Sequence, residues 1–442
     1  MNSAAVTAAP SSMAHRSGTS ASSPLSRDDP RVREIRALLG AGQLDAADER
    51  ISTLLDAAGD HPYAWDLRGV VAHMRGDHRM ARSHTRRAIH LKEDETDFHE
   101  HMALYLHLLA RPADAIESAR RALALLEQPR ESSAGSAIRR AALHDLWGRM
   151  ARIYGELDTA VEQHEMACTL DPDRLGYASN LAIACAEHPD HGARGLTRIR
   201  DLTRQAPDDA EFHFNRGIIE RKIGGSTDAL DAFNRTLELM PTHAGAAMEL
   251  ATLQERSGAP EEADATLSAL LTRIPEAHDV RFNRGLLRLR SHSWESGFLD
   301  FEARYHMPDI PTPRVPAPRW IHPDDPVSED DGRACVREIK GRDLLVIAEQ
   351  GLGDTLQFSR FCARVREEFQ PASICLQVHP RLQPLLEGLT GIDRTASLKA
   401  PLPSHDVWTG AMSLPLLSRA ARDGDFRQPP CFAPSEDRRA RW

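Results

Sequence analysis

The sequence predicts a mainly α-helical protein, in which stacked helix hairpins are followed by a partial α/β domain. Two observations lead to this fold class. The tetrapeptide Phe-Asn-Arg-Gly at residues 214–217 recurs at residues 282–285, which is a spacing of 68 residues (282 − 214), or twice 34. After Gly341, short apolar runs alternate with helical patterns, and this alternation is typical of a parallel sheet.

The composition is ordinary for a soluble protein with an acidic balance. The 442 residues leave room for about three domains. The net charge is −10, and the basic residues are interspersed with acidic ones. This argues against a nucleic acid or an anionic membrane as the main partner. The six cysteines form no CxxC pair, so we expect reduced thiols and neither a metal site nor a cofactor.

The N-terminal residues 1–29 are rich in Ser and Ala and contain no apolar core of the kind a secretory signal requires. They are therefore predicted to form a disordered tail. No apolar run in the chain approaches the ~18 residues of a membrane span. Together these features predict a cytoplasmic protein without a membrane span.

Residues 30–307 are predicted to form a repeat array. With the glycine of the recurring tetrapeptide as position eight, the unit from residue 210 contains Gly217 and Gly224, and the unit from residue 141 contains Gly148 and Gly155. Small residues at these places let the two helices of a hairpin approach closely. An insertion is expected at 128–138, and we count about eight units: 28–61, 62–95, 96–129, 141–174, 175–209, 210–243, 244–277 and 278–307.

This pattern resembles the tetratricopeptide repeat family over some 280 residues, and 34 residues is the period of that repeat. The periodicity itself supports stacked helix pairs. The resemblance implies a right-handed α-solenoid whose concave groove binds peptides or protein segments.

Residues 308–340 contain seven prolines and an acidic run, which predict an extended connector. Trp320 either packs back on a neighbouring element or lies in a loop. From 341 to 442 we predict strands at 344–349, 374–378, 392–396 and 406–408, with helices at 355–369, 382–389 and 413–421. Strands that alternate with helices predict a parallel α/β sheet.

The glycine-containing hexapeptide at residues 349–354 connects the first of these strands to its helix. With the following residues 355–358 and with residues 412–415, it resembles the glycosyltransferase-like region of bacterial tetratricopeptide proteins. The segment from Trp294 to Arg304 looks like the divergent last repeat that commonly precedes this region. That region is similar to the heptosyltransferase family, whose enzymes have the two-Rossmann GT-B fold. The resemblance implies that Gly353 and Asp354 face the acceptor and that Asp354 is the general base.

A base must lie within hydrogen-bond reach of the hydroxyl that it deprotonates, and a turn at a strand end can deliver it. Gly351 and Gly353, with Leu352 between them, would let the backbone approach a sugar or phosphate closely. The alternative is that Asp354, with Gln357 three residues on, only caps the helix that starts at Thr355. The segment 341–442 is also shorter than the family's region, so we expect no sugar transfer unless another polypeptide supplies the donor domain.

Asn180, Asn215 and Asn283 all fall at position six of their units. The solenoid of the O-linked N-acetylglucosamine transferases looks similar, because an asparagine ladder there holds substrates. The alternative is that asparagine is simply frequent at this position, and Glu249 interrupts the series. The Arg86-Arg87 and Arg120-Arg121 pairs are interpreted as solvated helix faces.

The first functional hypothesis is a protein-interaction scaffold that binds polypeptide segments and carries an incomplete glycosyltransferase-like module. The second is a glycosyltransferase that selects a protein or glycan acceptor through its repeats, with a donor domain supplied elsewhere. The sequence names no nucleic-acid partner for either hypothesis.

Overall fold

The structure is a computed structural model, and it describes residues 27–127, 134–307, 315–322 and 334–424, with positions 310, 313 and 426. Most of the predicted N-terminal tail, residues 128–133 of the predicted insertion, part of the predicted connector and residues 427–442 lie outside the described residues.

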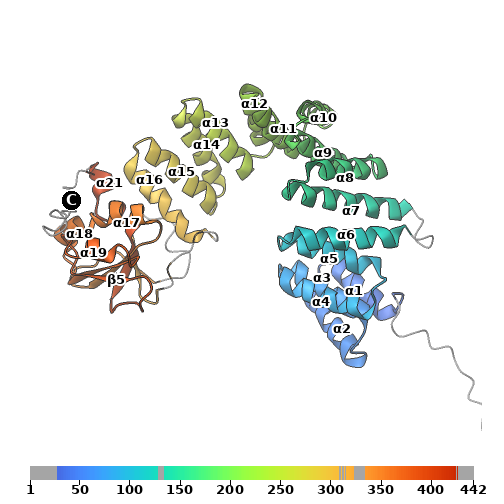
Figure 1. Cartoon of the computed structure of the whole chain (residues 1–442), viewed down its shortest axis with the longest axis horizontal. Coiled ribbons are helices and arrows are strands. Elements are labelled where there is room, and N and C mark those ends of the chain that lie inside the picture. Colours follow the sequence, from blue (N-terminus) through green and yellow to red (C-terminus); the bar gives the residue numbers. More distant parts are fainter. Residues whose placement is uncertain are drawn as a thin grey trace, which may run out of the picture. The chain divides into compact units, whose positions relative to one another are not determined.

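Helix hairpins follow one another along most of the chain (Figure 1). Their helices are α1 (Pro30–Gly40), α2 (Leu44–Ala57), α3 (Pro62–Met74), α4 (His78–Leu91), α5 (Thr96–Leu108), α6 (Pro112–Leu126), α7 (Ala134–Ile153), α8 (Leu157–Leu170), α9 (Leu175–Glu187), α10 (Gly192–Gln205), α11 (Ala210–Ile223), α12 (Ser226–Leu239), α13 (Ala244–Arg256), α14 (Pro260–Arg273), α15 (His278–Arg290) and α16 (Trp294–Phe301). The predicted array of helix hairpins is confirmed. The insertion was predicted too long, because its residues from Ala134 on belong to α7.

The glycine at position eight lets the two helices of a hairpin approach closely, as the repeat pattern predicts. A Cβ atom on Gly217 would lie 2.5 Å from Cε1 of Phe233, and one on Gly285 would lie 2.8 Å from the backbone nitrogen of Phe301. Both distances are well inside van der Waals contact. Only glycine therefore allows the two helices of these hairpins to pack so closely.

The chain folds as two compact units, and the division between them falls within the repeat array. The first unit ends at Pro207, so that α10 is its last helix, and the second begins at Asp208 and contains α11 to α16 together with the α/β part.

The α/β part contains one sheet of parallel strands in the order β2-β1-β6-β3-β4-β5. The four predicted strands are confirmed as β3 (Asp343–Ile347), β4 (Ser373–Val378), β5 (Arg394–Ser397) and β6 (Val407–Gly410). Two further strands, β1 (Arg319–Trp320) and β2 (Cys335–Val336), lie in the segment that was predicted to be a connector only. Each has two residues, which is too short to give a periodic signal among the prolines.

Trp320 packs back on the sheet and is not in a loop. Its side chain is 2% exposed, and its ring meets Phe369 edge to face with the centroids 5.1 Å apart. Trp408 on β6 donates its backbone N–H to the carbonyl of Pro318, which holds the start of β1 against the centre of the sheet.

The helices of the α/β part are shorter than predicted. The helix expected at 355–369 is divided into α17 (Leu352–Ser359) and α18 (Cys362–Phe369), because Phe361 between them turns into the core. The helix expected at 382–389 is reduced to α19 (Gln383–Leu386). The one expected at 413–421 divides into α20 (Leu414–Leu417) and α21 (Ala420–Asp423) around Arg419, whose φ of 58° lies in the left-handed region.

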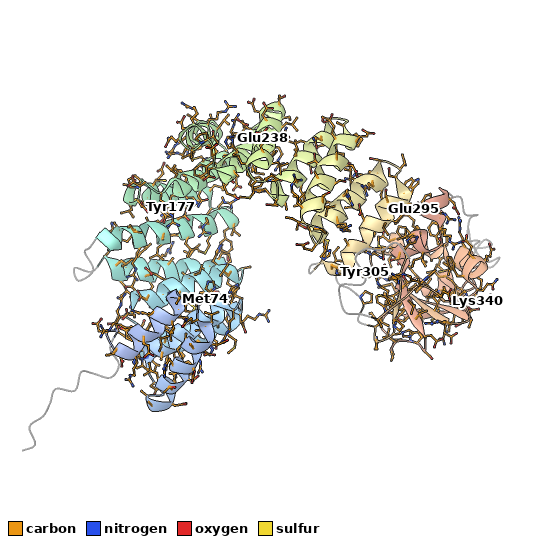
Figure 2. All side chains as sticks on the ribbon, turned by 180° about the vertical axis from the view of Figure 1, so that it is seen from behind. Met74, Tyr177, Glu238, Glu295, Tyr305 and Lys340 are labelled. Atoms are coloured by element: carbon orange, nitrogen blue, oxygen red, sulfur yellow. The ribbon has the colours of Figure 1, made fainter. Side chains whose placement is uncertain are left out.

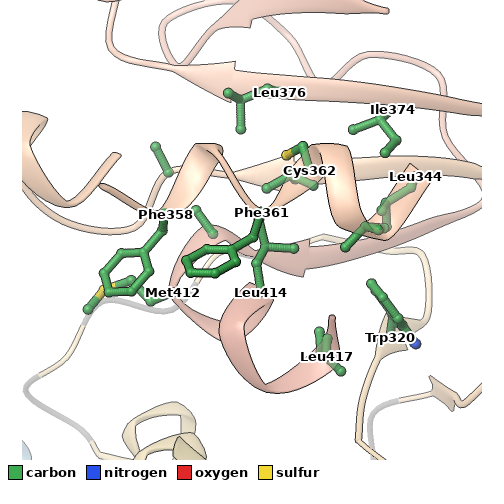
Figure 3. Close-up of a cluster of buried hydrophobic side chains, with 14 of the residues drawn as sticks. Trp320, Leu344, Phe358, Phe361, Cys362, Ile374, Leu376, Met412, Leu414 and Leu417 are labelled. Carbon is green, nitrogen blue, oxygen red and sulfur yellow. The ribbon is translucent and has the colours of Figure 1, made fainter. Parts of the chain in front are cut away.

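The last repeat contributes to the core of the α/β part. Phe298 and Phe301 of α16 are buried in the same apolar cluster as Leu344, Phe358 and Leu376. Figure 3 shows side chains of α17, α18 and α20 packed beneath the strands in this cluster. The apolar face of α16 is thus buried by the α/β part, and the two share one core.

Among the described residues, no helix combines the length and the apolar character that crossing a bilayer requires.

Candidate functional site

The glycine-rich turn lies where the sequence predicts, at the carboxyl end of β3. Gly351 is the N-cap of α17, and Leu352 and Gly353 are its first two residues. All three are exposed, and a Cβ atom on Gly353 would meet no heavy atom within 4 Å. The turn therefore has room for a ligand at the edge of the sheet where open α/β proteins bind theirs.

Asp354 caps its helix, but in a different register from the one predicted. It is the third residue of α17, and its Oδ2 accepts the backbone N–H of Gly351 at 3.1 Å. The expected start at Thr355 and the pairing with Gln357 are wrong, because the helix begins three residues earlier. Asp354 is half-buried, and one of its carboxylate oxygens is already engaged in holding the turn.

Glu349, the first residue of the turn, belongs to a buried polar network around Arg304. Arg304 is 1% exposed and lies on the 3-10 helix η2 (Glu302–His306) that follows α16. Its Nε and Nη2 donate to the two carboxylate oxygens of Glu349 at 3.3 and 3.1 Å. Glu349 Oε2 also accepts the backbone N–H of Met412 at 3.2 Å.

The same guanidinium group has further partners on both sides. Its Nη1 donates to Oε1 of Glu302 at 2.5 Å, and its Nη2 donates to Oγ of Ser413 at 2.7 Å. Ser413 in turn donates to Glu302 at 2.8 Å, and Arg319 on β1 donates to the other oxygen of Glu302 at 3.1 Å. We call this set of side chains the Arg304 network, and its members are Glu302, Arg304, Tyr305, Arg319, Glu349 and Ser413. The network joins the last repeat to β1, to the end of β3 and to the start of α20. Tyr305 is labelled in Figure 2.

The charges in this network balance one another. The ring of Tyr305 lies between the guanidinium groups of Arg304 and Arg319, whose carbons are 4.2 and 4.0 Å from its centroid. Burial raises the pKa of Glu302, but the cations of Arg304 and Arg319 outweigh burial and hold the pKa below its ordinary value. The carboxylate of Glu302 therefore remains ionised and paired.

Gly410, the last residue of β6, makes room for this arrangement. A Cβ atom there would clash with the carboxylate of Glu349 and the hydroxyl of Tyr305. Segments 294–304, 349–354 and 412–415 thus meet in a cluster of paired charges, which connects the last repeat to the sheet.

From the sequence, Glu302, Arg304 and Glu349 were recognised only as parts of longer segments, and no role was predicted for them. A signal was available for Glu349, which is a charged residue directly after the apolar run 344–348. Their pairing was not predictable, since Arg304 and Glu349 are 45 residues apart and Arg304 and Ser413 are 109 apart.

The three asparagines at position six do not share one environment. Asn180 lies in the first compact unit and donates its amide to Asp145 of the preceding repeat at 2.8 Å. The equivalent pair in an earlier repeat is His101, whose Nδ1 lies 2.9 Å from the carboxylate of Asp66. The amide nitrogen of Asn180 therefore connects neighbouring repeats.

Asn215 and Asn283 lie in the second unit, on a surface that we call the amide face. It is formed by position five and position six of three successive first helices: Phe214 and Asn215 on α11, Met248 and Glu249 on α13, and Phe282 and Asn283 on α15. Five of these side chains are half-buried, and Asn283 is exposed.

Contacts across the repeats join the amide face. Glu249 forms an ion pair with Arg221 of α11 at 3.1 Å. Nδ2 of Asn283 lies 3.6 Å from Sδ of Met248. Asn215 and Asn283 were candidate ligand-binding residues in the sequence, where Glu249 interrupts the series. It missed the apolar row at position five, although Phe214 and Phe282 lie within the repeated tetrapeptide.

Residues 32–97 and 190–244 match the family model of the tetratricopeptide repeat. Over 222 residues the chain is 25% identical to Protein FlbA of Caulobacter vibrioides, a match that covers 49% of this chain and 35% of that protein. The chain thus spans 35% of the length of this curated relative.

The chain is also similar, over part of its length, to two solved structures. The thermophilic tetratricopeptide repeat protein TTC0263 of Thermus thermophilus is 21% identical, with a TM-score of 0.36, over 44% of this chain and 100% of that one. Yeast Tom70 is 14% identical, with a TM-score of 0.38, over 64% of this chain and 78% of that one. The matched residues contain α1 from Val32 on, α2 to α4 and α10 to α12, so these helices match the tetratricopeptide repeat family, and α1 to α16 are successive helix hairpins.

Proposed function

We propose that the protein is an interaction scaffold that binds an extended polypeptide segment across the amide face. The observation that carries this proposal is the pair of parallel rows on α11, α13 and α15. Phe214, Met248 and Phe282 form the apolar row. The second row is polar and consists of Asn215, Glu249 and Asn283.

The two rows fit the chemistry of a peptide. Neighbouring helices lie about 10 Å apart, and an extended chain advances about 3.3 Å per residue. Every third residue of the ligand would therefore meet the equivalent position of the next repeat. The half-buried apolar row would receive side chains, and the amides would bind the ligand's backbone groups.

Asn283 shows how an amide of this face is prepared for such a ligand. Its Nδ2 donates to the carbonyl of Asp279 at 2.8 Å, which fixes the orientation of the side chain. Its carbonyl oxygen is on an exposed residue and can accept an N–H from a peptide backbone. Because the rotamer is already held, binding costs less conformational entropy.

The Asn215→Ala/Asn283→Ala variant is expected to bind a peptide ligand about tenfold more weakly than the wild type, since each lost hydrogen bond costs about 0.5–1.5 kcal/mol. The ligand is first selected from a random peptide library on the wild-type chain, and fluorescence anisotropy then measures Kd. The matched control is Asn234→Ala, an exposed asparagine on the second helix α12. Equal affinities of the double variant and the wild type would exclude the amide face as the binding surface.

A repeat-guided glycosyltransferase is the second candidate function. It is favoured by the exposed glycine turn at the carboxyl end of β3 and by the resemblance that makes Asp354 the general base. It is disfavoured by the Arg304 network, which leaves Glu349 fully paired, and by the bond from Gly351 that occupies one oxygen of Asp354.

We expect calorimetry to show no binding of nucleotide-sugars to the purified chain. A panel of nucleotide-sugars titrated into the wild type and into Asp354→Asn separates the two functions. Micromolar binding of one of them, with transfer that Asp354→Asn abolishes, would establish the enzyme and displace the scaffold as the main function.

A further inference from the structure

The second helix of the second repeat, α4, is strongly basic. Its 14 residues contain four arginines and three histidines, and no Asp or Glu. The acidic residues nearest in sequence lie outside the helix: Asp77 is its N-cap, and Glu93 follows its end. The helices α10 and α15 also contain four arginines each, but each of them includes an aspartate.

Arg79, Arg86, Arg87 and His90 of α4 are exposed, and Arg82 is half-buried. Arg79, Arg82, Arg86 and His90 are spaced by three or four residues, which places them on one face of a helix. The opposite face buries Ala81, Thr85 and Ala88. Together with Arg87 beside them, we call Arg79, Arg82, Arg86 and His90 the α4 strip.

Most of the α4 strip has no acidic partner. Arg87 forms an ion pair with Asp60 at 2.8 Å. Within residues 27–127, Arg79, Arg82 and Arg86 form no ion pair. The Nε of Arg82 is buried and makes no hydrogen bond to any described residue. Unpaired like charges three and four residues apart destabilise a helix. An anionic partner bound to these side chains would remove this repulsion.

The second helices of the neighbouring hairpins are α2 and α6, and both carry acidic side chains. On α2, Asp45, Glu49 and Asp56 are exposed, and on α6, Asp114 and Glu117 are exposed. The basic surface is therefore about one helix wide. A DNA duplex or a membrane is broader than one helix and would also meet the carboxylates of α2 and α6, which would repel it.

We propose that the α4 strip binds an acidic polypeptide segment in extended conformation. A helix of 14 residues is about 21 Å long, which matches about six residues of extended chain. Carboxylates of such a segment would form charge-assisted hydrogen bonds with the guanidinium groups of Arg79, Arg82 and Arg86. This surface belongs to the first compact unit and is independent of the amide face.

The test uses the full chain and a fluorescein-labelled peptide of about six glutamates, the length that matches the helix. Anisotropy at low ionic strength should give micromolar binding that weakens as salt is added, because the charges are exposed. Arg82→Gln/Arg86→Gln should weaken binding at least about tenfold, which corresponds to about 1.4 kcal/mol. Far-UV circular dichroism checks that this variant keeps its helices.

The matched control is Arg120→Gln/Arg121→Gln, which removes two exposed arginines from α6, a helix that also carries acidic residues. It should bind the peptide as the wild type does. Failure of the wild type to bind, or an equal loss in the control variant, would overturn the proposal. Tighter binding of a DNA duplex or of phosphatidylserine vesicles than of the peptide would also overturn it, by assigning the strip to another class of partner.

Discussion

The Gly410→Ala variant is expected to lose about 3–5 kcal/mol of the free energy of unfolding of the second compact unit. The added methyl group would clash with the carboxylate of Glu349 and the hydroxyl of Tyr305. Glu349 would then be pushed away from Arg304, so that an overpacked core and a broken buried ion pair would act together. Urea unfolding followed by tryptophan fluorescence measures the loss, because Trp320 and Trp408 are buried nearby.

Gly353→Ala is the matched control for this substitution. A methyl group there would meet no heavy atom within 4 Å, and Gly353 lies in the first turn of α17. Alanine has the higher helix propensity, so this variant should be neutral or more stable by up to about 1 kcal/mol. If Gly410→Ala were as stable as Gly353→Ala, the packing around Glu349 would not be as tight as the structure has it.

Replacing Arg304 by methionine is expected to cost about 3–5 kcal/mol at neutral pH, because Glu349 would lose the cation that it pairs with and Glu302 would keep only Arg319. The side chains of both carboxylates are less than a tenth exposed. Arg290→Met is the control in the same unit, since its ion pair with Glu255 is solvent-exposed and should contribute less than about 1 kcal/mol.

The pH dependence of this cost follows from the pKa of Glu302. In the wild type, that pKa lies below its ordinary value of 4.5, so the group stabilises the fold above pH 4.5, and this stability is lost as the pH falls through the lowered pKa. Without Arg304, only Arg319 of the two cations would oppose the effect of burial, so the pKa of Glu302 would be higher than in the wild type. The difference in stability between Arg304→Met and the wild type should therefore be largest at neutral pH and shrink towards pH 4.5. A difference independent of pH would show that lost packing, and not charge, dominates.

The repeat array was predictable because its signal is local and repeated. The tetrapeptide at 214–217 and 282–285 reports a packing requirement, since Gly217 and Gly285 each lie against the second helix of their own hairpin. Strands β3 and β4 were predictable for a similar reason, because each is an apolar run bounded by a change of pattern. Strands β1 and β2 were not, since two residues carry no period.

The candidate site was predictable only in part. The sequence indicated Asp354 as a helix cap, but the pairing register depends on where α17 starts, and that start is Leu352. It indicated Asn180 either as a ligand-binding residue or as an asparagine common at this position, and the structure adds that its amide donates to Asp145 of the preceding repeat. In both cases, the missing information was the position of a partner that sequence spacing does not determine.

The sequence by itself determined the helix hairpins, their 34-residue period and the alternation of strands and helices after Gly341, because each depends on contacts within a short segment. The tertiary structure alone decided that Glu349 faces Arg304 and Met412, and that Phe298 and Phe301 of the last repeat share a core with the sheet. The physical reason is that a buried charge must find its counter-charge wherever the fold brings one within reach, and here that partner is 45 residues away in the chain.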